Sequence, residues 1–337
     1  MKAAIFDAPH EMRLGSWPTP EPGSEDVVMA VNAAGICAGD LYIYSGKNPY
    51  AQYPIIGGHE VCGAVVKVGS NVHTVAPGQL VVIEPFLSCG KCYPCRVGKP
   101  NCCANLQIVG VHRPGGYAEY VMAPAANVHP VPNGVSAFRA SFAEPITIGL
   151  HACQRGQVSA AEYVLVLGCG PIGLAIIEVA LDRKARVVAT DIVSPRLDIA
   201  QSLGAETLKA DEKLMENVFA QTGGEGAPVV IEATGNPSVI QSTVDLVAAG
   251  GRIVIVGLVA KGVRVSLPGL ELTRKEVSIF GSRTEFGCFP EALALLANDK
   301  IRYPEVATEF DLWSAPAVFA DIARNPSMVH KGVFVLC

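Results

Sequence analysis

The hydrophobic pattern of the chain changes near residue 159. Before that point, short apolar runs rich in β-branched residues, such as 27–31 and 61–68, are separated by clusters of Gly, Pro and Asn. Such runs predict short strands joined by turns. We therefore expect the first 140 residues to form a barrel-like or mixed β domain with long loops.

After residue 159, apolar runs alternate with segments of helical pattern, the first of which covers 172–181. The expected strands are 164–168, 186–191, 228–233 and 251–257. Strands that alternate with helices predict an α/β fold with a parallel sheet built from βαβ units. Near its end the chain changes once more, to an expected helix at 291–298 and a closing strand at 332–336.

Composition sets the scale of this fold. The chain has 337 residues, of which 50% are hydrophobic and 17% are charged, against a usual charged share of about 25%. The length favours about two domains. The low charge indicates large cores and an apolar subunit interface.

Charge and patterning exclude several classes of partner. The net charge is −5 and the sequence has no basic run, so neither nucleic acid nor an anionic membrane surface is expected to bind. The longest apolar run, 164–177, has 14 residues and contains Gly and Pro, which makes it too short and too broken to span a membrane. The N-terminal residues lack the pattern of a signal peptide.

Four of the eleven cysteines stand close together in the sequence. Cys89, Cys92 and Cys95 are three residues apart, and Cys103 follows after a gap of seven residues. Four thiolates at this spacing can surround one tetrahedral ion, and zinc is often held in closed cages of four cysteines. Disulfides are the weaker alternative, because residues this close rarely pair with good geometry. We therefore expect a metal site and a reducing, cytoplasmic location.

A glycine-rich turn lies between the first expected strand and helix of the α/β segment. Gly168, Gly170 and Gly173 have the GxGxxG spacing, which permits a tight turn, close approach of a pyrophosphate and close packing of helix on strand. Asp191 ends the next expected strand, where a carboxylate binds ribose hydroxyls and repels a 2′-phosphate, so NAD is the expected cofactor. The alternative for Asp191 is a surface acid. Further residues assigned to the cofactor site are Pro171, Ile172, Arg196, Thr234 and Gly257.

A second set of metal-ligand candidates is spread along the first 150 residues. Cys37 lies upstream of His59 and Glu60, which follow a glycine turn. Thiolate, imidazole and carboxylate side chains form open zinc sites that leave one position for water or substrate. Glu144 lies in an apolar stretch, where a buried acid needs a partner such as a metal or its bound water. Taken alone, a His or Cys is more often a packed residue than a ligand.

The order of these motifs along the chain resembles that of the zinc-dependent medium-chain dehydrogenase/reductase family. The resemblance runs from Gly-Ile-Cys37 and Gly-His59-Glu60 through the four cysteines to Glu144-Pro and Gly-x-Gly-Pro-x-Gly, and so covers essentially the whole chain. Three segments look like the polyol (sorbitol-type) dehydrogenases and the L-idonate and L-galactonate 5-dehydrogenase group. These segments are 48–54, 109–117 and 141–153.

The resemblance implies a particular division into domains. A GroES-like, β-rich catalytic domain would cover 1–146 and 284–337 and carry a structural zinc lobe at about 86–106. A Rossmann dinucleotide-binding domain, a doubly wound parallel sheet, would cover 147–283. The active site would lie in the cleft between the two, and the protein would form a homo-oligomer, either a dimer or a tetramer.

The resemblance also implies roles for single residues. Cys37, His59 and Glu60 would hold a catalytic zinc, with Glu144 bound to the ion directly or through water. Arg283 matches a position where polyol dehydrogenases keep an arginine near cofactor and substrate, and an interdomain salt bridge is its alternative role. The implied ligands of the structural zinc are Cys89, Cys92, Cys95 and Cys103.

One position departs from the family pattern. A Ser or Thr two residues after the ligand cysteine usually relays the proton in this family, but this chain has Gly39 there. Tyr42 or a water held by Glu144 could take over the relay. A third alternative is that the extra space admits a bulkier substrate.

The expected function is hydride transfer between NAD and a secondary alcohol of a polyol, sugar or sugar acid of the L-galactonate or L-idonate kind. The alternatives among enzymes are an L-threonine dehydrogenase and a simple alcohol dehydrogenase. A non-catalytic regulatory protein that binds NAD and zinc is the alternative from another class. A zinc-ribbon module for nucleic acid fits poorly with the acidic net charge.

Overall fold

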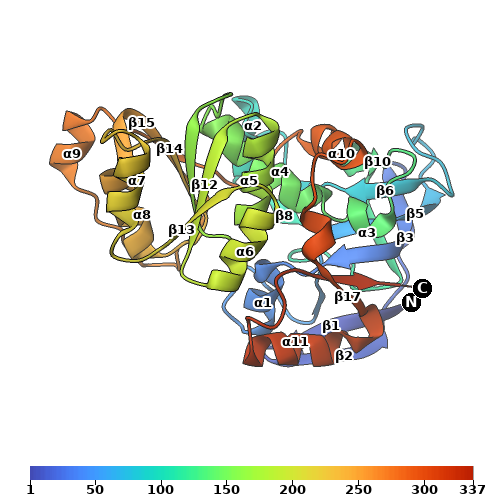
Figure 1. Ribbon diagram of the computed structural model, residues 1–337. Helices are drawn as coiled ribbons and strands as arrows, with labels where there is room; N and C mark the ends of the chain where they lie inside the picture. The colour runs from blue at the N-terminus through green and yellow to red at the C-terminus, as the bar shows by residue number, and fades with distance from the viewer. Residues whose placement is uncertain (337) are drawn as a thin grey trace. The chain divides into compact units, whose positions relative to one another are not determined.

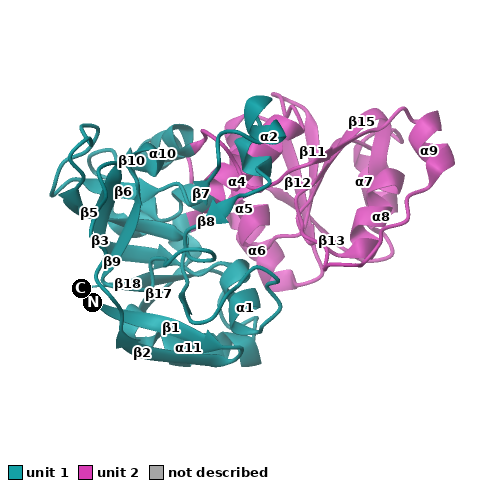
Figure 2. Ribbon diagram, turned by 180° about the vertical axis from the view of Figure 1, so that it is seen from behind, with its two compact units in different colours: residues 1–144, 289–299, 304–337 teal, residues 145–288, 300–303 magenta. Residues whose placement is uncertain are grey.

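The computed structural model describes residues 1–336 and divides into two compact units (Figures 1 and 2). Unit 1 comprises 1–144, 289–299 and the segment from 304 to the end of the described chain, and unit 2 comprises 145–288 and 300–303. The expected domain boundaries, after residues 146 and 283, lie within a few residues of the two main boundaries between the units.

Unit 1 is built mainly from antiparallel strands. Its larger sheet has the order β10-β6-β5-β3-β18-β17, with β9 also paired to β3, and its smaller sheet has the order β2-β1-β4. The larger sheet comprises β3 (Asp26–Gly35), β5 (Glu60–Val68), β6 (Leu80–Ile83), β9 (Tyr120–Pro124), β10 (Val128–Pro130), β17 (Thr308–Asp311) and β18 (Gly332–Val335). The remaining strands are β1 (Lys2–Ala8), β2 (Glu11–Ser16), β4 (Ile55–Ile56) and the pair β7 (Phe86–Leu87) and β8 (Gln107–Ile108).

Short helices connect these strands. They are α1 (Ala38–Tyr44), α2 (Tyr93–Arg96), α3 (Ala137–Ala140), α10 (Phe289–Ala297) and α11 (Ala315–Arg324), with 3₁₀ turns at Pro100–Cys102, Ala125–Asn127, Tyr303–Val306 and Leu312–Ser314. Helix α4 (Ala143–Arg155) begins in unit 1 and continues in unit 2. The expected mixed β domain with long loops is confirmed, as are the late helix and the closing strand, which are α10 and β18.

Unit 2 is a six-stranded sheet whose neighbouring strands all run parallel, in the order β13-β12-β11-β14-β15-β16. Its strands are β11 (Tyr163–Leu167), β12 (Arg186–Asp191), β13 (Glu206–Lys209), β14 (Ala227–Glu232), β15 (Val247–Ile255) and β16 (Ser278–Gly281). Its helices are α5 (Pro171–Asp182), α6 (Ser194–Ser202), α7 (Leu214–Gln221), α8 (Pro237–Leu246) and α9 (Gly269–Arg274). Helices α5 and α6 cover one face of the sheet, and α7 and α8 cover the other (Figure 1).

This strand order is that of a doubly wound dinucleotide-binding sheet, in which the ligand binds beyond the carboxyl ends of the strands where the order reverses. The reversal falls between β11 and β14. The parallel βαβ sheet expected from the sequence is therefore confirmed. None of the helices formed by residues 1–336 combines the length and apolarity needed to cross a bilayer.

A cluster of aromatic rings fills the core of unit 1. Phe319 of α11 meets Phe6 edge-on, with ring centroids 5.1 Å apart, and also contacts Tyr44, Tyr117 and Phe334. Phe6, Tyr117, Phe319 and Phe334 are completely buried. Edge-to-face rings at these separations add about 0.5–1.5 kcal/mol to the free energy gained by burial alone. Helix α11 is thereby fixed to β1, α1 and β18, which carry Phe6, Tyr44 and Phe334.

We predict that Phe319→Ala destabilises unit 1 by about 3–5 kcal/mol, because it leaves a cavity among four other rings. Both tryptophans, Trp17 and Trp313, belong to unit 1, so their fluorescence during urea unfolding reports on that unit. Phe319→Leu keeps most of the volume and is expected to cost far less. Equal midpoints for the Ala and Leu variants would contradict the role of this cluster.

Candidate metal and cofactor sites

Cys37 sits at the start of α1 in a loop shaped by its own hydrogen bonds. The Sγ atom of Cys37 accepts a hydrogen bond from Gly39 N at 3.4 Å, and Cys37 N donates to Asp40 Oδ2 at 3.0 Å. These two bonds form a reciprocal cap that fixes the first turn of the helix. The thiol is thus held in a fixed position at the N-terminus of α1.

His59 and Glu60 follow a turn that requires glycine. Gly58 has a φ of +88°, and a Cβ atom there would lie 2.7 Å from the ring of Tyr117. Glu60 then opens β5 opposite Gly35 of β3, where a Cβ atom would lie 1.8 Å from Glu60 Oε2. Both glycines are therefore needed for the backbone to bring these side chains into place.

Cys37, His59 and Glu60 converge on one point. One potential ligand atom from each of the three lies within 4.8 Å of the others. A soft thiolate, an imidazole and a carboxylate at this separation fit a zinc ion with room for a further ligand. The sequence-based grouping of these three residues agrees with their positions in the structure.

Asp40 is a buried acid that sequence analysis missed. Its carboxylate accepts hydrogen bonds from Tyr117 Oη at 2.8 Å and from Gly58 N at 3.3 Å, and its Oδ1 lies 3.6 Å from His59 Nδ1. Burial alone would lower the pKa of His59, but Cys37 and Asp40 together raise it well above its usual value. The sequence pattern that could have identified Asp40 is an acid three residues after Cys37, at the third position of a short helix.

Lys331 is the second residue that sequence analysis missed. It is 3% exposed, and its Nζ donates to Ile36 O at 3.0 Å and to both carboxylate oxygens of Glu60. Burial opposes the charged form of Lys331, but Glu60 raises its pKa above the usual value. Because Lys331 lies 271 residues from Glu60, no local pattern could have linked the two.

Glu144 and Tyr42 are not members of the group of three converging side chains. Glu144 is buried at the start of α4 and is not one of the three residues whose ligand atoms lie within 4.8 Å. The pKa of Glu144 is raised to about 7. Burial is the main cause, His59 opposes the increase and Glu60 adds to it. Tyr42 lies on α1 and is 50% exposed.

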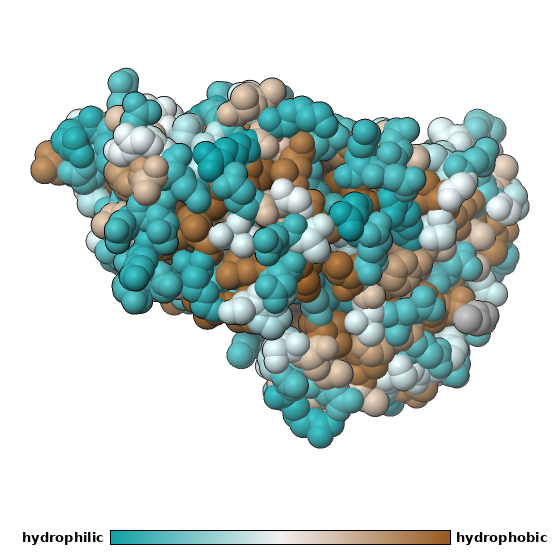
Figure 3. Space-filling model, in the orientation of Figure 1, coloured by the Kyte–Doolittle hydropathy of each residue, from teal (hydrophilic) through white to brown (hydrophobic). Residues whose placement is uncertain are grey.

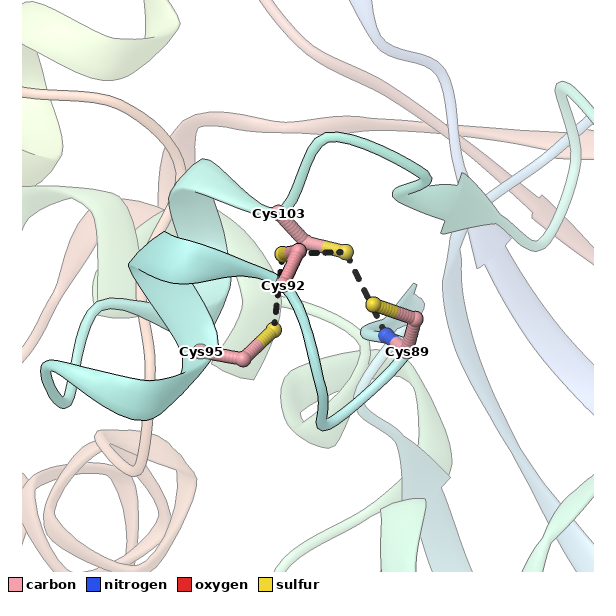
Figure 4. Close-up of side chains that lie close together, drawn as sticks. All are labelled: Cys89, Cys92, Cys95 and Cys103. Carbon is pink, nitrogen blue, oxygen red and sulfur yellow. Dashed lines mark hydrogen bonds between the residues drawn. The ribbon is translucent and has the colours of Figure 1, made fainter.

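The four cysteines of the lobe gather around one point in unit 1 (Figure 4). Cys92 Sγ lies 3.4 Å from Cys95 Sγ and 3.7 Å from Cys103 Sγ. Zn–S bonds of about 2.3 Å in a tetrahedron place the sulfurs about 3.8 Å apart, so these separations fit zinc. None of the four forms a disulfide, and the neighbouring Cys102 is exposed.

Backbone N–H groups donate to sulfur atoms of the lobe. Cys103 Sγ accepts hydrogen bonds from Cys89 N and Asn105 N, both at 3.3 Å. The backbone N–H groups of Lys91 and Cys92 lower the pKa of Cys89 to about 6. The thiolate is the form that binds metal.

The glycine-rich turn after β11 has the shape that a dinucleotide needs. Gly168 has a φ of +103°, and a Cβ atom on Gly173 would lie 1.9 Å from Gly168 O. These two glycines are required by the fold itself. A Cβ atom on Gly170, by contrast, would meet no described atom within 4 Å. The open side at Gly170 is where a pyrophosphate can approach the N-terminus of α5, which begins with Pro171 and Ile172.

Asp191 is held against this turn and is not a surface acid. It is 7% exposed, and its carboxylate accepts hydrogen bonds from Cys169 N at 2.9 Å and Val193 N at 2.8 Å. Arg196 Nη1 lies 3.7 Å from Asp191 Oδ2. Asp191 therefore ties the end of β12 to the glycine-rich turn and lies beside a cation.

Polar groups also collect at the carboxyl ends of the other strands of unit 2. Glu232 ends β14, and one of its oxygens accepts hydrogen bonds from Thr234 N at 2.6 Å and Gly235 N at 3.0 Å. The other oxygen of Glu232 and the hydroxyl of Ser282 are buried without a hydrogen-bond partner among the described residues. Such unsatisfied groups mark a place where a polar ligand fits. Sequence analysis assigned Thr234, Gly257 and the exposed Arg283 to this edge but missed Glu232 and Ser282.

Two protein-family models match the chain. The alcohol dehydrogenase GroES-like domain matches residues 23–133, and the zinc-binding dehydrogenase family matches residues 171–298. Both models agree with the fold class expected from the sequence, a GroES-like domain and a Rossmann domain.

Individual proteins match over nearly the whole length. An uncharacterized zinc-type alcohol dehydrogenase-like protein of Haemophilus influenzae is 35% identical over 98% of this chain and 97% of its own length. L-galactonate-5-dehydrogenase of Escherichia coli K12 is 35% identical over 89% of this chain and 88% of its own length.

A solved structure agrees equally well in fold. The crystal structure of the rspB alcohol dehydrogenase of Escherichia coli CFT073, complexed with NADH, covers 100% of this chain and 99% of that chain with a TM-score of 0.93 and 32% identity. The agreement extends over both units, of which unit 1 carries the two candidate metal sites and unit 2 the glycine-rich turn. The chain therefore belongs to the zinc-type medium-chain dehydrogenase/reductase family and resembles its polyol dehydrogenase members.

Proposed function

We propose that the protein transfers a hydride between NAD and a secondary alcohol of a polyol, sugar or sugar acid, with zinc as its metal cofactor. The observation that carries the proposal is the convergence of Cys37, His59 and Glu60 within 4.8 Å. The same chain has a glycine-rich turn whose close backbone contacts leave room for a dinucleotide. The 35% identity to L-galactonate-5-dehydrogenase makes L-galactonate and L-idonate the first substrates to test.

The residues around the catalytic ion would have separate tasks. Cys37 and His59 would hold the ion. Asp40, which lies beside Nδ1 of His59, would keep the ring oriented so that Nε2 faces the ion. When bound, zinc supplies a Lewis acid that eases deprotonation of an alcohol, as it lowers the pKa of bound water from 15.7 to about 7. Because the pKa of Glu144 is raised to about 7 by burial, its carboxylate can accept a proton near neutral pH. Tyr42 is the second candidate for this relay.

Glu60 would be shared between the ion and Lys331. Its carboxylate is bonded to the Lys331 ammonium, so direct ligation of zinc would have to weaken that pair. Lys331 would otherwise hold Glu60 at the edge of the coordination sphere. Either arrangement keeps a buried negative charge compensated, which a buried carboxylate requires.

Unit 2 would hold the cofactor at the carboxyl ends of its strands. The pyrophosphate would lie at Gly170 and the N-terminus of α5, and the adenosine ribose would lie beside Asp191 and Arg196. The charge of Asp191 disfavours a 2′-phosphate, which supports NAD as the cofactor. Thr234, Gly257 and Arg283 would line the remainder of the site.

We also propose that the protein is a homo-oligomer, either a dimer or a tetramer. Strand β16 is the last strand of its sheet, and Ile279 in it is 40% exposed. Nearby in the chain, Leu258 and Leu270 are 83% and 77% exposed. Figure 3 shows apolar residues exposed between hydrophilic ones on the face in view. Unpaired sheet edges with exposed apolar side chains need a partner.

Ten free cysteines in the described chain support a reducing location such as the cytoplasm.

The proposed function predicts NAD reduction, followed at 340 nm, with one or more members of a panel of polyols, L-galactonate, L-idonate, L-threonine and simple secondary alcohols. His59→Ala removes a ligand and is expected to lower kcat by at least 100-fold, while the control His73→Ala, at an exposed histidine outside the group of three converging residues, retains most activity. Two bound zinc ions and bound NAD without turnover of any alcohol would instead indicate a regulatory binding protein.

The lobe predicts a clean difference between two adjacent cysteines. Cys103→Ser removes one of the four converging thiols, so the purified protein is expected to lose about one of two zinc ions per chain in metal analysis. Cys102→Ser changes an exposed neighbour outside that group and is expected to keep both ions. Loss of zinc from the Cys102 variant alone would show that the fourth ligand is assigned wrongly.

The buried pair of Glu60 and Lys331 predicts a double-mutant result in zinc-free protein. Lys331→Met leaves the Glu60 carboxylate buried without its cation, which typically costs about 3–5 kcal/mol. The double variant Glu60→Gln/Lys331→Met removes both charges and is expected to recover most of that loss in urea unfolding. Equal destabilisation in the single and double variants would mean that packing, not charge, accounts for the effect.

A further inference from the structure

Gly39 leaves an open space directly beside two of the candidate zinc ligands. A Cβ atom on Gly39 would lie 3.7 Å from Cys37 Sγ and 3.7 Å from His59 Cε1, and no other described atom outside the adjacent residues and the backbone of α1 would come within 4 Å of it. These are ordinary van der Waals distances. The space is therefore large enough for at least a methyl group, which glycine lacks.

The fold does not require glycine at this position. Gly35, Gly58 and Gly173 are each forced, because a Cβ atom there would lie within 3 Å of neighbouring atoms. Gly39 has no such contact, and its φ is not in the left-handed region. It lies within α1, where glycine weakens a helix relative to alanine or serine. Glycine at position 39 lowers helix stability and is not needed for packing. We therefore look for its reason in the space that it leaves at the site.

We propose that Gly39 is a specificity-determining residue and that the space beside it receives an uncharged, hydroxyl-bearing substituent on the carbon next to the reacting carbinol. The inference rests on the proposed function. An alcohol whose oxygen points at the ion held by Cys37 and His59 has its neighbouring carbon close to those ligands. A side chain at residue 39 would compete with that carbon's substituent for the same space.

The surroundings determine the charge of the substituent. Cys37, Asp40, Glu60 and Glu144 are acidic groups in or next to the site, and a divalent ion together with the cationic Lys331 would offset them without leaving an excess of positive charge. The backbone N–H of Gly39 already donates to Cys37 Sγ at 3.4 Å, so it is not free to bind a carboxylate. A neutral polyol chain therefore fits beside Gly39 better than the carboxylate of a sugar acid. Any such carboxylate would lie at the far end of the substrate.

The test compares Gly39→Ala, which fills the space, with Gly39→Ser, which fills it and adds a hydroxyl. Ala38→Ser, at the exposed neighbouring residue, is the matched control. For each protein, kcat/KM is measured with the best polyol of the panel and with 2-propanol, a secondary alcohol with only methyl substituents. Polyol affinity is measured separately by quenching of NADH fluorescence in the enzyme–NADH complex. Circular dichroism and zinc content establish that each variant is folded and loaded.

We expect both Gly39 variants to lower the ratio of polyol to 2-propanol kcat/KM by about tenfold or more, since one methyl group in a fitted site changes discrimination by about 10–200-fold. Polyol affinity should weaken in parallel, and the Ala38 variant should match the unmodified protein. If Gly39→Ser raises kcat on both alcohols while Gly39→Ala changes nothing, residue 39 concerns proton relay and the proposal is wrong. Unchanged ratios and affinities in both variants would also overturn it. A lack of turnover by the unmodified protein would refute the proposed function, while the fluorescence titration would still test Gly39.

Discussion

The carboxylate of Asp40 joins the two loops from which the catalytic metal candidates project. It accepts hydrogen bonds from Cys37 N in one loop and from Gly58 N in the other, and Tyr117 Oη donates to it from a third segment. The Asp40 carboxylate itself is completely buried, where the loss of a hydrogen bond is costly. The separation between Cys37 and His59 is thus set by one acid that need not touch a metal. Tyr117 adds a second function to this arrangement, because its ring also packs into the aromatic core.

Charge compensation is the second constraint on this region. Asp40, Glu60 and Glu144 are all at most 5% exposed, and Lys331 is buried with them. Without a metal, His59 and Lys331 supply the positive charge, and the pKa values of both are raised accordingly. A divalent ion at Cys37, His59 and Glu60 would take over that task. The buried acidic groups of this region therefore favour a nearby positive charge, which either a metal ion or the protonated His59 and Lys331 can supply.

Most of the fold and of the ligand set could be predicted because the signals were local. The cysteine spacing, the glycine-rich turn and the strand ending at Asp191 each lie within a few residues, and hydrophobic periodicity separated the two kinds of sheet. Asp40 had a weak local signal, but its importance depends on Tyr117, 77 residues away. Lys331 and Ser282 had none, since only the folded chain shows that they are buried beside other polar groups. The spacing of the glycines in the sequence also could not distinguish Gly35, which packing requires, from Gly39, which it does not.

The distant origin of Lys331 has a consequence for how the protein is made. The ammonium that compensates Glu60 comes from the residue before β18, and β18 itself pairs with β3 near the N-terminus. Residues 145–288 form most of unit 2 and leave the ribosome well before that strand. The nucleotide-binding unit can therefore reach its fold during synthesis, while the metal-binding unit stays incomplete until β18 emerges. Translation thus completes the nucleotide-binding unit before the metal-binding unit, although the metal-binding unit begins earlier in the sequence. The N-terminal segments must remain able to pair with β18 until that strand has been synthesised.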